Sequence, residues 1–138
     1  MTIRGNVVGS LLVGAVALVA VTSCSSTAGN YADLSAEPSA EDDLPAQLYE
    51  DDAVAEVSLE SVRAVGSHEG VELWLAEAAT PGQVCLVAFA EDAAYQVTCG
   101  TTFTTGGQAG AFLVVPDTNI KPDDATKPVS ANVYALDS

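Results

Sequence analysis

The side chains best suited to chemistry in this sequence of 138 residues are three cysteines, a single histidine and a large excess of carboxylates. Two of the cysteines, Cys85 and Cys99, can form a disulfide, hold a metal ion or carry out a redox reaction. His68 stands next to Glu69 but lacks the second histidine that a zinc-protease helix requires. We therefore interpret His68 as an exposed turn residue, and we predict no metal site and no cofactor.

Catalysis by a serine or by paired carboxylates has little support in the spacing of the residues. Ser67 adjoins His68, but neighbouring residues on a strand point to opposite faces and cannot form a catalytic pair. Glu69, Glu72 and Glu77 could serve as general acid and base, yet any strongly acidic surface offers such pairs. The sequence therefore favours a protein that is not an enzyme.

The acidic character of the chain excludes some classes of partner. There are 19 Asp and Glu against 4 Lys and Arg, which gives a formal net charge of −15. Such a surface repels nucleic acid and anionic lipid headgroups, and it attracts cations or basic proteins. We predict no nucleic-acid partner, because the basic patch that one requires is missing from the composition.

One acidic loop has some features of a calcium site. Residues 117–124 hold four Asp or Asn side chains, but Lys121 and Pro122 occupy the positions of a ligand and of the turn glycine in an EF-hand. We interpret residues 118–128 as a polar surface loop between two strands.

The best-defined element in the sequence is a hairpin that contains both Cys85 and Cys99. Residues 84–90 are apolar on both faces, which predicts a central strand covered on both sides. Pairing about Asp92 would place three facing pairs on one side of the hairpin and would turn two polar side chains outward. The pairs are Phe89 with Tyr95, Val87 with Val97 and Cys85 with Cys99, and the outward residues are Gln96 and Thr98. This register predicts a cross-strand disulfide, with a bridge between two sheets or a reduced pair as the alternatives.

The remaining strands follow the same pattern of short apolar runs between turns. Residues 62–75 form a hairpin with Gly70 in its turn, and Trp74 lies on the face opposite Leu73, partly exposed or under the preceding segment. A type II turn is expected at residues 80–83, an edge strand or loop at 100–107, and strands at 111–115 and 129–136. We predict a mainly β domain over residues 57–138. We expect it to be an antiparallel meander of five or six strands in one twisted sheet or a small open barrel.

The N-terminal region determines where the protein is expected to lie. Arg4 precedes an apolar run over residues 7–21, which has the length of a signal-peptide core. The motif Val21-Thr22-Ser23-Cys24 that ends it resembles the lipobox of bacterial lipoproteins. The resemblance implies that residues 1–23 are a cleaved signal peptide and that the Cys24 thiol carries diacylglycerol. The alternatives are an uncleaved membrane anchor and an ordinary secretory signal cut after Ser23.

Residues 24–56 are rich in Ser, Ala, Pro, Asp and Glu, and they contain no Lys or Arg. Like charges repel and there is little apolar surface to bury, so we predict a disordered, extended tether. A specific role of its acidic runs in binding calcium or a basic protein is the alternative.

The domain also resembles the C-terminal module of small lipoproteins from high-GC Gram-positive bacteria. The shared features are Gly70, the run at residues 84–87, Cys99-Gly100 and the late motif at residues 115–117. The resemblance implies a shared fold and export but no known activity.

Together, these features predict a non-enzymatic lipoprotein that the lipid on Cys24 holds at the extracytoplasmic face of the cell membrane. Its β module would bind an envelope or extracellular protein. The alternatives are an envelope hydrolase or redox accessory enzyme that uses Glu69, Glu72 or a reactive Cys85–Cys99 pair, and a collector of cations or basic ligands that uses the acidic tether.

Overall fold

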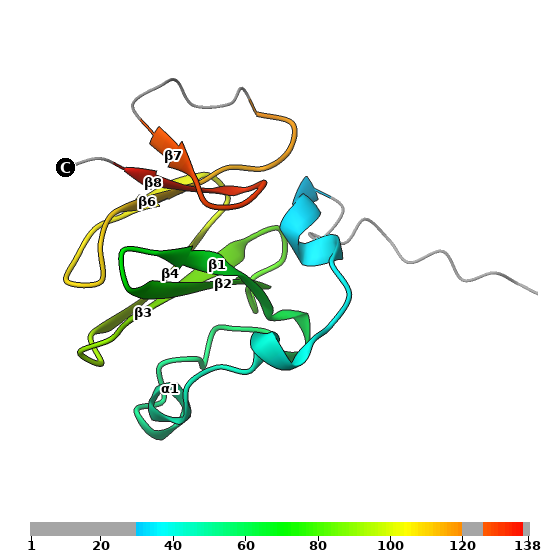
Figure 1. Cartoon of the computed structure of the whole chain (residues 1–138). Helices are drawn as coiled ribbons and strands as arrows, with labels where there is room; N and C mark the ends of the chain where they lie inside the picture. Colours follow the sequence, from blue (N-terminus) through cyan, green and yellow to red (C-terminus); the bar gives the residue numbers. More distant parts are fainter. Residues whose placement is uncertain (1–29, 120–125, 137–138) are drawn as a thin grey trace, which may run out of the picture.

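The computed structural model describes residues 30–119 and 126–136, and it contains two four-stranded antiparallel sheets (Figure 1). The predicted signal peptide and Cys24 lie outside the described residues. The first sheet has the order β1-β2-β3-β4 and consists of β1 (Arg63–His68), β2 (Val71–Glu77), β3 (Val84–Ala90) and β4 (Tyr95–Gly100). The second has the order β5-β6-β8-β7 and consists of β5 (Phe103–Thr105), β6 (Phe112–Val114), β7 (Thr126–Pro128) and β8 (Val133–Leu136).

The predicted mainly β, antiparallel fold is confirmed, but its strands are divided between two sheets that do not close into a barrel. The first sheet is a simple meander, as expected. In the second sheet β8 lies between β6 and β7, so the chain does not follow a meander there. β7 occupies the end of the segment that we predicted to be only a loop, because residues 126–128 pair with the edge of β8.

The turn chemistry of the first sheet agrees with the sequence. Glu69 and Gly70 both have positive φ, 51° and 79°, which a two-residue type I′ hairpin turn requires. Gly82 has φ 82° in the turn before β3, where Gln83 N–H donates to the Thr80 carbonyl at 3.3 Å. The first turn joins β1 to β2, and the second leads from β2 into β3, which lies between β2 and β4.

A hydrophobic core fills the space between the two sheets. Alternation along each strand turns one set of side chains inward, and those from β2, β3, β6 and β8 form one buried cluster. Its members include Val71, Leu73, Leu75, Val84, Leu86, Ala88, Phe112, Val114, Val133 and Ala135. Gln96, which we predicted to point outward, instead donates to Thr105 Oγ1 at 3.1 Å and to the Gly110 carbonyl at 2.9 Å. Its amide therefore links β4 to the second sheet.

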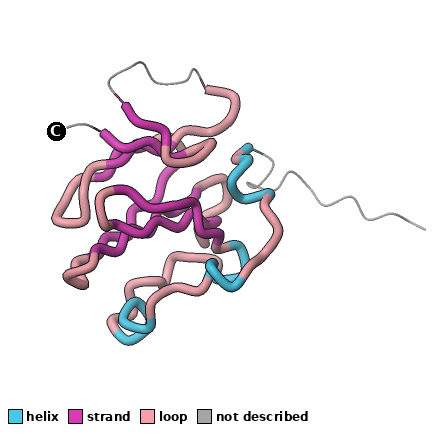
Figure 2. Tube along the Cα trace, in the orientation of Figure 1, coloured by secondary structure: helices cyan, strands magenta, loops and turns pink. Residues whose placement is uncertain are grey.

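The segment before the first strand is folded, so the prediction of a disordered tether is wrong for residues 30–56. It contains the short helices η2 (Ala32–Ser35), η3 (Ala40–Asp42) and α1 (Ala46–Glu50), and η4 (Leu59–Ser61) follows before β1 (Figures 1 and 2). Five of its large apolar side chains are buried: Tyr31, Leu34, Leu44, Leu48 and Val54. They are widely spaced along the chain, and they belong to two hydrophobic clusters that also contain side chains from the sheets.

This N-terminal segment covers the outer face of the first sheet, the face turned away from the second sheet. Leu44, Leu48 and Val54 pack there in one cluster with Trp74 and Val87. The prediction that β3 is covered on both sides is thus confirmed, with one cover supplied by the second sheet and the other by the N-terminal segment.

Asp33 in η2 fastens the start of this segment to the second sheet. Its carboxylate accepts hydrogen bonds from Ser130 Oγ at 2.6 Å and from the backbone N–H of Asn132 at 3.0 Å and of Ala131 at 3.2 Å. In return, the Asn132 side-chain carbonyl accepts the Asp33 N–H at 2.9 Å. Asn132 is fully buried and also donates to the Val115 carbonyl and to Asp117 Oδ1. Every polar atom of the Asn132 side chain is therefore paired, as burial requires.

Candidate functional site

The predicted disulfide between Cys85 and Cys99 is confirmed, and it joins β3 to β4 in the expected register. All three predicted pairs face one another, since Phe89 is opposite Tyr95 and Val87 is opposite Val97. The Cys85 sulfur is fully buried beneath the N-terminal segment, 3.8 Å from the Glu56 carbonyl. The pair thus belongs to the hydrophobic cluster on the outer face.

Replacing both Cys85 and Cys99 with alanine is expected to lower the free energy of unfolding by about 3 kcal/mol. The disulfide restricts the unfolded chain, and a loop of about 15 residues gives an effect of this size. Urea denaturation of the oxidised protein and of the double variant measures the difference. Coincident unfolding curves would contradict the expectation.

His68 is half-buried rather than an exposed turn residue. β1 extends through it before the chain turns at Glu69, and its side chain is 25% exposed. The ring lies edge-on to Phe112 with centroids 6.3 Å apart, and Nε2 is 3.9 Å from a carboxylate oxygen of Glu69. His68 is therefore mainly a packing residue at the rim of the core.

The carboxylates that we considered for acid–base chemistry are not arranged as a pair. Glu72 and Glu77 are five positions apart on β2, an odd number, so they point to opposite faces of the sheet. Glu69 lies in the hairpin turn. Among residues 30–119 and 126–136, no group of three or more His, Cys, Asp or Glu side chains is placed to hold a metal ion.

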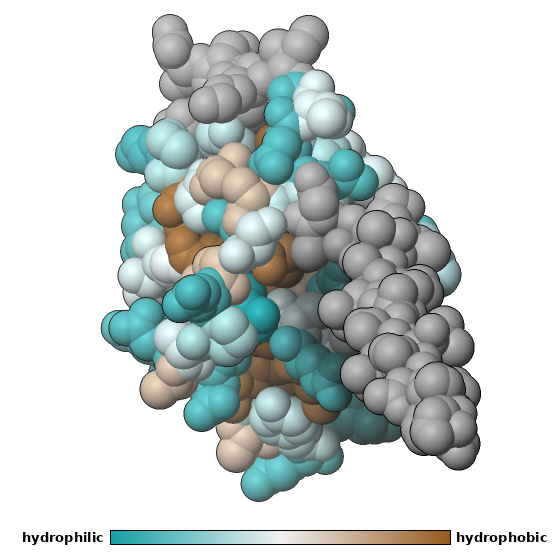
Figure 3. Space-filling model, turned by 90° about the vertical axis from the view of Figure 1, so that its right-hand side faces the viewer, coloured by the Kyte–Doolittle hydropathy of each residue, from teal (hydrophilic) through white to brown (hydrophobic). Residues whose placement is uncertain are grey.

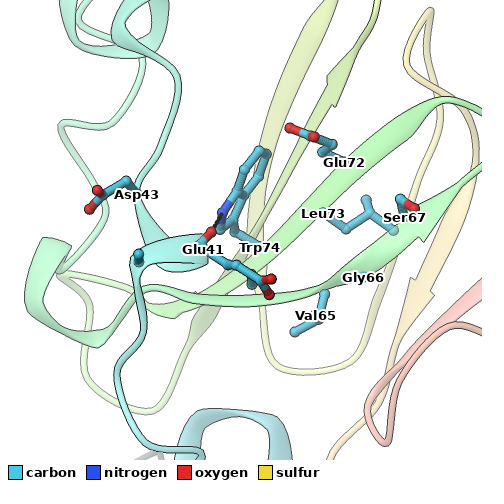
Figure 4. Close-up of a pocket in the computed structure, with 10 residues that line it drawn as sticks. Glu41, Asp43, Val65, Gly66, Ser67, Glu72, Leu73 and Trp74 are labelled. Carbon is cyan, nitrogen blue, oxygen red and sulfur yellow. Dashed lines mark hydrogen bonds between the residues drawn. The ribbon is translucent and has the colours of Figure 1, made fainter.

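A groove of about 630 Å³ lies between the N-terminal segment and the β1–β2 hairpin (Figure 4). We call it the outer-face groove. Its volume lies within the range of ligand-binding sites. One wall is η3 with the residue that follows it, and the other is the hairpin. The lining residues are Ala40, Glu41, Asp43, Ala64, Val65, Gly66, Ser67, Glu72, Leu73 and Trp74.

Trp74 forms the floor of the outer-face groove and fixes the position of η3. Its indole Nε1 donates to the Glu41 carbonyl at 3.0 Å, and the side chain is only 4% exposed. We predicted that Trp74 would be partly exposed or would lie under the preceding segment, and the second alternative is confirmed. Figure 4 shows Glu41 beside the indole and Glu72 projecting from the same strand as Trp74.

Asp42 fastens the other side of η3 to the edge of the sheet. Its carboxylate accepts the backbone N–H of Ser39 at 2.7 Å and that of Ala64 at 2.8 Å. The second bond uses a peptide N–H of the edge strand β1. Next to it the register between β1 and β2 shifts at Val65, which forms a β-bulge. The groove wall is thus held by hydrogen bonds at both Asp42 and Trp74.

A second hollow of about 270 Å³ adjoins the groove and shares Ser67 and Glu72 with it. It extends across the sheet to Phe89 and Glu91. Ser67, Glu72, Phe89 and Tyr95 are paired in register across the four strands, so they form one row on the outer face. The two hollows therefore form a continuous surface along this row.

Tyr95 closes the far end of the row. Its ring stacks on Phe89 with centroids 6.5 Å apart, and its hydroxyl donates to Asp51 Oδ2 at 3.0 Å. This hydrogen bond to the Asp51 carboxylate raises the pKa of Tyr95, because losing the proton would place a second negative charge beside the first.

The electrostatic character of the groove is negative. Glu41, Asp43, Glu72 and Glu91 are all exposed, and within the described part of the chain no Lys or Arg lines either hollow. Arg63 is held outside the groove, where Nε donates to the Ala36 carbonyl at 2.8 Å and Nη1 to the Val62 carbonyl at 2.8 Å. A groove with an apolar floor and carboxylates around it suits a positively charged ligand.

The surface crossed by the N-terminal segment also combines polar and apolar residues. Figure 3 shows hydrophilic residues on the outside of this face and hydrophobic ones recessed between them.

None of the helices in the described ranges has the length and hydrophobicity needed to cross a membrane.

Sequence reasoning did not find the groove, because Glu41 and Asp43 were assigned to a disordered tether. They meet Glu72 and Trp74 only after the N-terminal segment has folded onto the sheet. No protein-family model, curated protein sequence or solved structure matches this chain.

Proposed function

We propose that this protein is a non-enzymatic, lipid-anchored binding module on the outer face of the cell membrane. The lipobox-like motif that ends at Cys24, after an apolar run of signal-peptide length, supports the anchor. The observation that carries the binding role is the outer-face groove, whose walls are held in place by Asp42 and Trp74. We propose that an extracytoplasmic protein is the partner.

The fold of the N-terminal segment changes the expected distance between the domain and the membrane. The described residues begin at Asn30, so the link from Cys24 to the domain spans at most about 20 Å when fully extended. An extended tether over residues 24–56 would have reached about 110 Å. We therefore expect the partner to be bound close to the membrane surface rather than deep in the envelope.

Lipidation is tested on the native protein and on a Cys24→Ala variant. Mass spectrometry is expected to find Cys24 as the N-terminal residue with a diacylglyceryl group, and the protein is expected in the membrane fraction. The variant is expected to lose the lipid and the membrane association, since two acyl chains provide the stable anchor.

A Ser25→Ala variant is the control and is expected to stay in the membrane fraction. An intact Met1, or a free thiol at Cys24 in the native protein, would contradict the anchor.

A further inference from the structure

We propose that the outer-face groove binds an extended polypeptide segment that carries arginine or lysine side chains. This inference deepens the proposed binding function and rests on it. Three properties of the groove point to this partner: its negative charge, its apolar floor and its continuity across the sheet.

Charge complementarity selects a basic partner. Glu41 and Asp43 stand on the wall formed by the N-terminal segment, and Glu72 stands on the sheet. Glu91 adds a fourth carboxylate, in the adjoining hollow. At neutral pH these carboxylates, in a chain of formal charge −15, attract a positively charged segment and repel an acidic one.

The apolar lining suits the long stems of arginine and lysine. Half-buried Ala64 lines the outer-face groove beside Trp74, and half-buried Phe89 lines the adjoining hollow; all three belong to the hydrophobic cluster on the outer face. Arginine and lysine can lay their methylene groups on such a surface while their charged ends meet carboxylates at the rim. A guanidinium group can also stack on the Phe89 ring.

The shape of the site favours a segment of chain over a single cation. The two hollows, about 630 and 270 Å³, adjoin at Ser67 and Glu72. Together they offer room for several consecutive residues of a peptide. The side chains of that peptide can reach the separate carboxylates of the two hollows. A small metal ion would use few of these contacts.

Recognition is expected to rely on side chains rather than on an added β-strand. Asp42 already occupies the peptide N–H of Ala64, and the bulge at Val65 interrupts the edge of β1. Both features prevent continuous pairing with a second strand. An extended ligand can therefore lie across the outer face but cannot extend the sheet along the whole of β1.

The protein contains one tryptophan, Trp74, and that residue forms the floor of the groove, so its fluorescence reports occupancy directly. The full-length chain, in micelles of an uncharged detergent, is titrated with a ten-residue peptide of alternating arginine and glycine. The expected result is a saturable change in emission, with heat released or absorbed in calorimetry. The affinity is expected to fall as salt is added. A peptide with glutamate in place of arginine is expected to give no change.

Matched variants locate the binding. Glu41→Gln and Glu72→Gln are each expected to weaken peptide binding about threefold to fivefold, the effect of one partly screened charge pair. Glu50→Gln removes the same charge from an exposed position of α1 outside both hollows, and it is expected to bind like the parent. Circular dichroism checks that all three variants are folded.

Three results would overturn the inference. One is the absence of saturable binding of the arginine peptide. Another is an equal loss of affinity in Glu50→Gln, which would assign binding to the overall charge. The third is a response to calcium chloride without a response to the peptide, which would indicate a cation site. Cys24→Ala is expected to bind the peptide normally, so a failure of the anchor and a failure of the groove are distinguishable.

Discussion

Replacing Leu48 with alanine is expected to lower the free energy of unfolding by about 3 kcal/mol, as buried leucines in well-packed cores generally do. Leu48 lies on α1, in the segment that composition assigns to a tether, yet its side chain is 0% exposed. It packs in the outer-face cluster with Trp74 and Val87. The midpoint of thermal unfolding is expected to fall by about 15 °C, which scanning calorimetry measures.

The neighbouring residue provides a matched control. Tyr49 is on the same helix, but its side chain is 49% exposed, so Tyr49→Ala is expected to change stability by about 0.5 kcal/mol or less. Equal stability of Leu48→Ala and the parent would mean that the N-terminal segment is not part of the folded domain. The outer-face groove would then lose one of its walls.

The second large effect is expected at Asp33. Asp33→Ala removes the acceptor of three hydrogen bonds, from Ser130 Oγ and from the N–H groups of Ala131 and Asn132. Donors left without a partner in a half-buried site cost about 1 to 3 kcal/mol. We therefore expect the free energy of unfolding to fall by about 3 kcal/mol in urea denaturation.

Asp92→Ala is the control for the loss of an aspartate. The Asp92 carboxylate accepts one hydrogen bond, from the N–H of Ala94 in an exposed turn, so its loss is expected to cost about 1 kcal/mol or less. A double-mutant cycle of Asp33→Ala and Asn132→Ala is expected to show strong coupling, because the two residues share hydrogen bonds. Additive effects would show that Asp33 and Asn132 act independently.

The first sheet could be predicted from the sequence because its strand pairing is determined by residues that are close together in the chain. Cys85, Val87 and Phe89 alternate along one strand, and their partners follow at matching distances after a short turn, so a single register satisfies all three pairs. The Gly70 turn is equally local. The position of Gln96 could not be predicted in this way, since its partners belong to a second sheet that the strand pattern alone does not reveal.

The N-terminal segment and the groove could not be predicted, because the necessary contacts are distant in sequence. The large apolar side chains of the segment are isolated among polar and acidic residues: Leu34, Leu44, Leu48 and Val54. The composition of the segment therefore predicts disorder. Their burial depends on the sheet formed by later residues. Likewise, Glu41 and Glu72 acquire a shared groove only through the hydrogen bonds of Trp74 and Asp42.

The bonds between Asp33 and residues 130–132 also constrain the order of events during synthesis. The partners are separated by 97 to 99 positions, nearly the whole length of the folded part. A growing chain that has not yet reached Asn132 cannot secure η2, and contacts between such distant positions form slowly. The hydrogen bonds that hold η2 therefore form only after residues 130–132 have been made, and a chain truncated before Ser130 would leave η2 without them.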